Sequence, residues 1–153
     1  MRHPTSSVPA LVLNEPFVDS RVAYLPTDID RCFGRDNLPD HADLLANLVQ
    51  WVARESSPLK VEGPGLIDCH LYRQEDRLIL HVVSLTSAGT WRAPIHELIP
   101  VGPLTIRVKL PERVRGRAVW LLVAENDIRS ATEDGWVCFD VPLVTDHEVA
   151  VIS

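Results

Sequence analysis

The sequence predicts an α+β, mainly β fold, in which a small α/β segment precedes an antiparallel β-sandwich. Two short apolar runs near the N-terminus are followed by one amphipathic helical pattern, and six or seven short strand patterns with turn residues between them fill the remainder. Hydrophobic residues make up 46% and charged residues 24% of the 153 residues, which are globular proportions. The chain is too short for a (β/α)₈ barrel, which needs about 250 residues.

The first segment, residues 1–57, begins with a predicted hairpin. The apolar run at 11–13 and the run Arg21–Leu25 are joined by residues typical of turns, and two short strands joined in this way indicate a β-hairpin. A loop is expected over residues 27–38.

A helix is predicted over residues 39–55. Pro39 suits a first helical turn, because its missing N–H has no partner there in any case. Apolar residues then recur at spacings of three and four, which predicts one buried stripe: Leu44, Leu45, Leu48, Val49 and Val52.

The second segment, residues 58–153, is predicted to be the sandwich. The clearest strand is 104–110, where apolar and polar residues alternate, so one face is buried and the other is wet. Trp120 lies within an apolar run and is expected in the core. The remaining strands are expected at 60–62, 66–73, 77–85, 117–123, 136–141 and 147–152.

Composition excludes several classes of function. The chain carries 15 Lys+Arg against 21 Asp+Glu and a net charge of −6, without the basic stripe that nucleic-acid binding requires. No apolar run approaches the roughly 20 residues of a membrane span. The three cysteines form no CxxC and the N-terminus lacks a secretory pattern, so we expect reduced thiols in a cytoplasmic protein with no cofactor.

One candidate ligand site follows the second predicted strand. Asp28 and Asp30 could hold a cation, and Arg31 could hold a carboxylate or phosphate. The alternative is that both aspartates accept backbone N–H groups in a turn while Arg31 pairs with one of them, and local turn chemistry favours this alternative.

A second candidate lies in the long connection 87–102. Connections of this length are often functional, so Trp91, with its neighbour Arg92, is a candidate ligand contact, although tryptophans in small β domains more often pack in cores. His70 and His81 are expected to face each other across a hairpin as a packing pair, because zinc sites need three or four ligands. No catalytic motif is present, and we assign no catalytic or metal residue.

Several stretches resemble a known family. Pro9–Glu15, Arg21–Arg31 and Leu44–Trp51 look like the end of the β-galactosidase trimerisation-type α/β domain of family-42-like glycoside hydrolases, a domain similar to a class I glutamine amidotransferase fold. Val61–Leu66 and Trp91–Pro103 resemble the C-terminal β-sandwich of the same proteins. The relatives are the uncharacterised "hypothetical glycosyl hydrolase 6" proteins.

The resemblance implies a non-catalytic accessory or assembly module. In the family a catalytic barrel comes first and carries the catalytic glutamates, and these 153 residues contain no counterpart of that barrel. Two alternatives stay open. The chain could be a carbohydrate-binding module that uses Trp91, or a subunit of a split enzyme whose barrel is on another chain.

A partner is also expected. One hairpin and one helix cannot cover both faces of a sheet, and exposed strand edges tend to pair with another chain. We therefore expect a homo-oligomer, or a complex with a barrel-bearing partner chain, formed through residues of about Pro9–Leu25.

Overall fold

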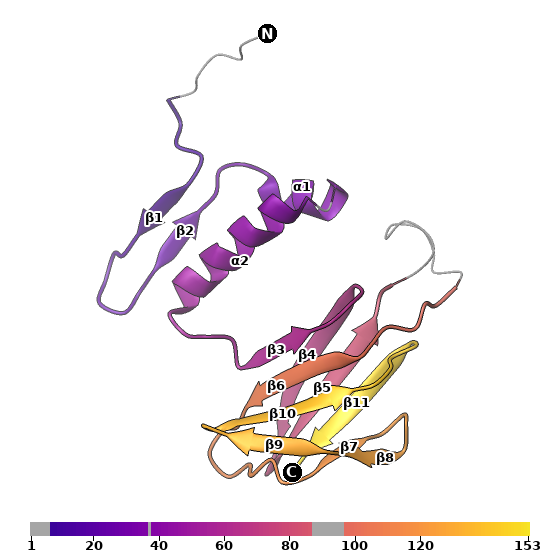
Figure 1. Ribbon diagram of the computed structural model, residues 1–153. Coiled ribbons are helices and arrows are strands. Elements are labelled where there is room, and N and C mark those ends of the chain that lie inside the picture. Colours follow the sequence, from indigo (N-terminus) through magenta and orange to yellow (C-terminus); the bar gives the residue numbers. More distant parts are fainter. Residues whose placement is uncertain (1–6, 37, 87–96) are drawn as a thin grey trace. The chain divides into compact units, whose positions relative to one another are not determined.

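The computed structural model describes residues 7–36, 38–86 and 97–153, which form two compact units within Met1–Ser57 and Pro58–Ser153. The first unit contains a two-stranded sheet and two helices, and the second contains two larger antiparallel sheets (Figure 1). The predicted fold class, a small α/β segment followed by an antiparallel β-sandwich, is confirmed.

The first unit begins with the predicted hairpin. Strands β1 (Val12–Asn14) and β2 (Val22–Tyr24) pair antiparallel, with Leu13 opposite Ala23. Asp19 adopts a positive φ of 65° in the connecting turn, a conformation that aspartate tolerates better than most residues.

Helix α2 (Pro39–Ala53) is the predicted helix, and it ends two residues earlier than expected. Pro39 occupies the first turn and Asp40 supplies a negative charge near the N-terminus, where it interacts favourably with the helix dipole. Arg54 ends the helix in the left-handed conformation, and its backbone N–H donates to the Gln50 carbonyl.

The expected loop over 27–38 is wrong in its central part, because helix α1 (Ile29–Asp36) forms there. Its apolar residues Ile29, Cys32 and Phe33 stand at helical spacing but span only one turn, and none of them is fully buried. The Cys32 N–H donates to the Asp28 carbonyl at 2.9 Å, which closes its first turn.

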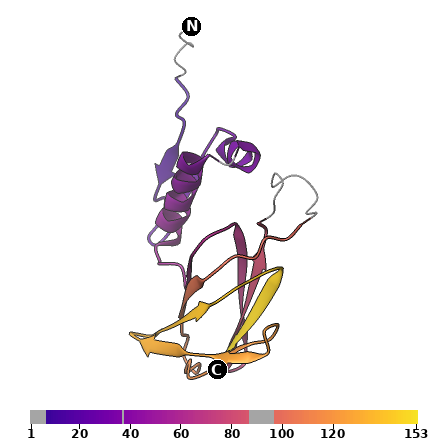
Figure 2. The same ribbon diagram turned by 45° about the vertical axis from the view of Figure 1, so that its right-hand side comes forward.

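The second unit is a sandwich of a four-stranded sheet, β3-β6-β10-β9, and a five-stranded sheet, β4-β5-β11-β7-β8. Figure 2 shows the strands of the two sheets in separate layers. The strands are β3 (Leu59–Glu62), β4 (Ile67–Gln74), β5 (Arg77–Ser84), β6 (Leu104–Lys109), β7 (Val119–Leu121), β8 (Asn126–Ile128), β9 (Ser130–Glu133), β10 (Trp136–Val141) and β11 (His147–Ile152).

The core of this unit consists of side chains that alternate between buried and exposed along its strands. In β5, β6 and β11 every second residue is buried, and the hydrophobic ones among them pack into one cluster with members of β7 and β10. Leu80, Leu104, Ile106 and Ile152 are fully inaccessible to solvent. The Asp134–Gly135 turn, with φ of 51° and 77°, joins β9 to β10.

Two expectations about this unit are wrong. The predicted strand 117–123 is only three residues long, and the chain then turns into β8 and β9, which the sequence analysis did not identify. Trp120 is not a core residue. Its neighbours Val119 and Leu121 point inward, so the indole lies on the outer face with 38% of its surface exposed.

Candidate functional site

The predicted site at Asp28, Asp30 and Arg31 is an exposed surface in the structure. Arg31 Nη1 donates to Asp28 Oδ2 at 3.1 Å, and the two side chains are 82% and 67% exposed. Asp30 is exposed in the first turn of α1. An ion pair that is this open to water contributes about 0–1 kcal/mol.

The second predicted site, Trp91 and Arg92, lies outside the described residues. The histidine pair is within them, and the register places His70 directly opposite His81 as expected. Both rings contact Tyr72, with centroid distances of 6.4 Å from His70 and 5.7 Å from His81.

Metal binding finds no support in the described part of the chain. No group of three or more His, Cys, Asp or Glu side chains there is arranged to hold an ion, and the three cysteines are free. Burial raises the pKa of the Cys69 thiol, and the nearby Asp68 charge raises it further, so this thiol stays protonated at neutral pH.

Neither helix among these residues is long and apolar enough to cross a membrane.

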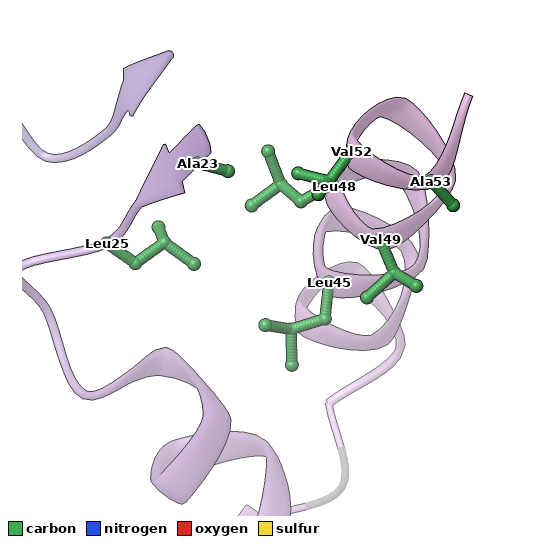
Figure 3. A pocket seen from close by; sticks show the side chains of 7 residues that line it. All are labelled: Ala23, Leu25, Leu45, Leu48, Val49, Val52 and Ala53. Atoms are coloured by element: carbon green, nitrogen blue, oxygen red, sulfur yellow. The ribbon is translucent and has the colours of Figure 1, made fainter. Parts of the chain in front are cut away.

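The first unit has an apolar groove between β2 and α2, which we call the unit 1 groove. It encloses about 390 Å³. Figure 3 shows Ala23 and Leu25 directed toward the helix, and Leu45 and Leu48 directed back toward the strand. Val49, Val52 and Ala53 complete the lining. All seven side chains are hydrocarbon, so the groove can bind an apolar surface and holds no acid, base or nucleophile.

The predicted helix stripe is only partly buried. Leu48 is 8% exposed, whereas Val49 is 67% and Val52 is 39% exposed. Within the described part of the first unit, Leu48 is the one buried hydrophobic residue. The helix therefore packs on the hairpin along one side of its stripe, and the other side of the stripe forms the rim of the groove.

A polar cluster holds the hairpin against the end of α2. The Arg21 guanidinium donates to Glu15 Oε1 at 2.7 Å and to the Trp51 carbonyl at 3.0 Å, and it lies 5.0 Å from the centroid of the Trp51 ring. Arg54 Nη1 donates to Asp19 Oδ1 at 3.0 Å. The positive charge of Arg21 lies where the helix dipole presents its negative end. These contacts set the position of β2 relative to α2, and so the shape of the groove.

The sequence analysis placed Leu45, Leu48, Val49 and Val52 on one helix face but did not identify a groove. The signal was present in the chain, because the helix stripe is wider than the apolar side chains of so short a strand can cover. From the strand side the groove lining contains Ala23 of β2 and Leu25, which follows β2 directly.

Comparisons with known proteins indicate the fold of this chain but do not assign it to a family. No family model matches the chain, and no curated protein matches it in sequence. Among solved structures, an α-L-fucosidase isoenzyme 2 from Paenibacillus thiaminolyticus matches with a TM-score of 0.68 at 20% identity, over 86% of this chain and 20% of that chain. The chain shares its fold with part of a glycoside hydrolase.

The match extends beyond the sandwich. The second unit makes up less than two thirds of the chain, so a match over 86% includes part of the first unit as well. The chain spans only a fifth of the fucosidase's length. A cycloisomaltooligosaccharide glucanotransferase from a Paenibacillus species, complexed with cycloisomaltoheptaose, matches over 64% of this chain and 17% of its own at 12% identity. Its TM-score of 0.48 is too low to indicate a shared fold.

Proposed function

We propose that this chain is a non-catalytic accessory module of a glycoside-hydrolase-like protein, and that its first unit mediates assembly. The observation that carries the proposal is the unit 1 groove, whose lining is wholly apolar and whose rim residue Val49 is 67% exposed. Contiguous apolar surface of this kind in a small unit usually marks an interface.

The occupant we propose is another part of a glycoside-hydrolase-like protein. The fold occurs as one fifth of a much longer α-L-fucosidase chain, which supports a role beside larger domains. The family-42-like resemblance adds that a unit of this kind is the end of an α/β domain whose earlier strands and helices would cover the groove. A barrel-bearing chain that supplies those elements is the partner we favour over a second copy of this chain.

The exposed hairpin extends the proposed interface toward Pro9–Leu25. Val12, Val22 and Tyr24 are 39%, 49% and 60% exposed on a sheet of only two strands. A strand edge in such a sheet keeps unpaired backbone donors and acceptors, which another strand can satisfy.

The test uses two valines of the same unit. Val49→Glu places a carboxylate on the groove rim, and Val18→Glu places one in the hairpin turn, where the side chain is 93% exposed and outside the groove. Without its partner, the isolated chain should self-associate through the uncovered groove at micromolar concentration. Light scattering during size-exclusion chromatography should show that Val49→Glu shifts the protein to monomer and Val18→Glu does not.

Hydrogen exchange separates the outcomes further. In the self-associated protein the amides of Arg21–Leu25 should be protected, and in monomeric Val49→Glu they should exchange faster. A monomer at all concentrations with protected amides over Arg21–Leu25 would show that the chain covers this surface itself, and the assembly role would be wrong. A discrete, stable homodimer that retains no affinity for a barrel-bearing chain would replace the favoured partner with a second copy.

A further inference from the structure

The outer face of the five-stranded sheet carries two exposed aromatic rings in one row. The register pairs Tyr72 with Ile79, Ile79 with Val151, and Val151 with Trp120, so these four side chains lie side by side across β4, β5, β11 and β7. Three strand spacings separate the Tyr72 and Trp120 positions, which corresponds to about 14 Å. Tyr72 is 56% and Trp120 is 38% exposed.

A groove covers the part of this row formed by Tyr72, Ile79 and Val151, and Trp120 continues the row beyond the groove lining. The groove encloses about 670 Å³ and has Ile79, Val149 and Val151 as its apolar floor, with Tyr72 at one side and Leu122 at the other. The two histidine contacts described above hold the Tyr72 ring from two directions. An aromatic ring that is already oriented loses less side-chain entropy when a ligand stacks on it.

The polar side chains in the groove lining are planar or cationic. They are Arg73, Gln74, Arg77 and His81, and no carboxylate belongs to the lining. Arg73 donates to the carbonyl oxygens of Glu75 and Glu112, which are neutral acceptors that leave its charge in place. Arg77 is 4.0 Å from Asp76 Oδ1, at the limit of an ion pair. The lining thus brings two arginines to the Tyr72 end of the row, whereas Asp127 lies opposite Trp120 at the other end.

We propose that this face binds an acidic oligosaccharide, with sugar rings stacked on Tyr72 and Trp120 and a sugar carboxylate held by Arg77. A pyranose ring presents a C–H face that packs on aromatic and aliphatic carbon, and a hydroxyl edge that hydrogen-bonds to amides and imidazoles. The guanidinium of Arg77 matches a carboxylate in bidentate geometry. Polar groups are interspersed with the apolar ones here, whereas the centre of a stable protein interface is depleted of charged residues.

This proposal is independent of the assembly role, because it concerns the second unit and residues that do not line the unit 1 groove. The full chain is titrated with tetragalacturonate, with its methyl ester, in which the carboxylates are neutralised, and with tetraglutamate as an acidic peptide. Amide chemical shifts report where each probe binds, and calorimetry gives the affinity.

The expected result is binding of tetragalacturonate with shifts confined to β4, β5, β11 and β7, and weaker binding of the ester. Tyr72→Ala and Trp120→Ala should each weaken binding by about tenfold, and Tyr72→Phe, which keeps the ring, should restore it. Arg77→Gln should reduce the preference for the free acid over the ester. The matched control is Trp136→Ala on the other sheet, whose ring already contacts Lys60 and Arg107 at 5.4 and 5.7 Å. It should bind within twofold of the unaltered chain.

Several outcomes would overturn the proposal. These are failure of tetragalacturonate to bind at millimolar concentration, equal binding of the ester, equal binding of tetraglutamate, and equal loss of affinity in Trp136→Ala. Tyr72 and Trp120 point away from the core, so their variants should keep the fold, and their amide spectra without ligand check this directly.

Discussion

At the scale of single residues, Glu148 is a charged side chain buried in the sandwich. It is 3% exposed, and its carboxylate accepts three backbone hydrogen bonds. Oε1 accepts from the N–H groups of Val123 at 2.9 Å and Val149 at 2.8 Å, and Oε2 accepts from Ala124 at 3.1 Å. The Glu148 carboxylate therefore satisfies two N–H groups of the loop between β7 and β8, whose Leu122 N–H donates to the Val149 carbonyl of β11 at 2.9 Å.

Removal of this carboxylate should destabilise the sandwich. Glu148→Ala leaves three backbone N–H groups without their acceptor and should lower the free energy of unfolding by about 1–3 kcal/mol. Glu148→Gln keeps one carbonyl oxygen and should lose less. Urea unfolding measures both, with the exposed Glu133→Ala as control. Equal stability of Glu148→Ala and Glu133→Ala would show that the loop does not depend on this side chain.

At the scale of elements, the contact between hairpin and helix is polar as much as apolar. Arg21 links the turn residue Glu15 to the carbonyl of Trp51, and Arg54 links the other side of the turn through Asp19. With Leu48 as its one buried hydrophobic residue among those described, this unit relies on such contacts to keep β2 facing α2.

Arg21→Ala should loosen the hairpin. Hydrogen bonds to charged groups contribute about 1.5–3 kcal/mol, so the amides of Val12–Asn14 and Val22–Tyr24 should exchange at least about tenfold faster. The control is Arg31→Ala, which removes an arginine of the same unit from an exposed ion pair. Unchanged exchange in the hairpin of Arg21→Ala would mean that apolar contacts with α2 alone hold it in place.

At the scale of the whole molecule, the two units differ in how completely they are built. All of the buried hydrophobic residues in the described ranges except Leu48 lie in the second unit, which has a continuous core between its sheets. The first unit keeps its apolar groove open to solvent. This asymmetry supports the proposal made above that a partner covers the first unit.

The isolated chain should have no glycosidase activity. The resemblance places the family's catalytic glutamates on a barrel with no counterpart in these 153 residues, and the unit 1 groove is lined by hydrocarbon alone. A panel of chromogenic aryl glycosides that includes an α-L-fucoside should show no turnover above buffer. Hydrolysis that survives repurification and disappears when one carboxylate of this chain is replaced would reverse this expectation.

The sequence by itself determined several of the local elements. Alternation in Leu104–Lys109 and the spacing of apolar residues in Pro39–Ala53 predicted a strand and a helix, because burial on one face imposes a period of two on strands and 3.6 on helices. The hairpin and the opposition of His70 and His81 followed from turn residues at fixed positions.

The tertiary structure alone decided which surfaces stay open. In the run Val119–Leu122 every residue is apolar, so the sequence shows no alternation that would tell the inward side chains from the outward ones. Trp120 lies on the outer face, in register with Val151. Tyr72 reaches the same row only through long-range register, and Val49 is exposed because the small hairpin covers one side of the helix stripe. Local periodicity encodes what a segment can bury, whereas the partners that a sheet or helix finds in space determine what it does bury.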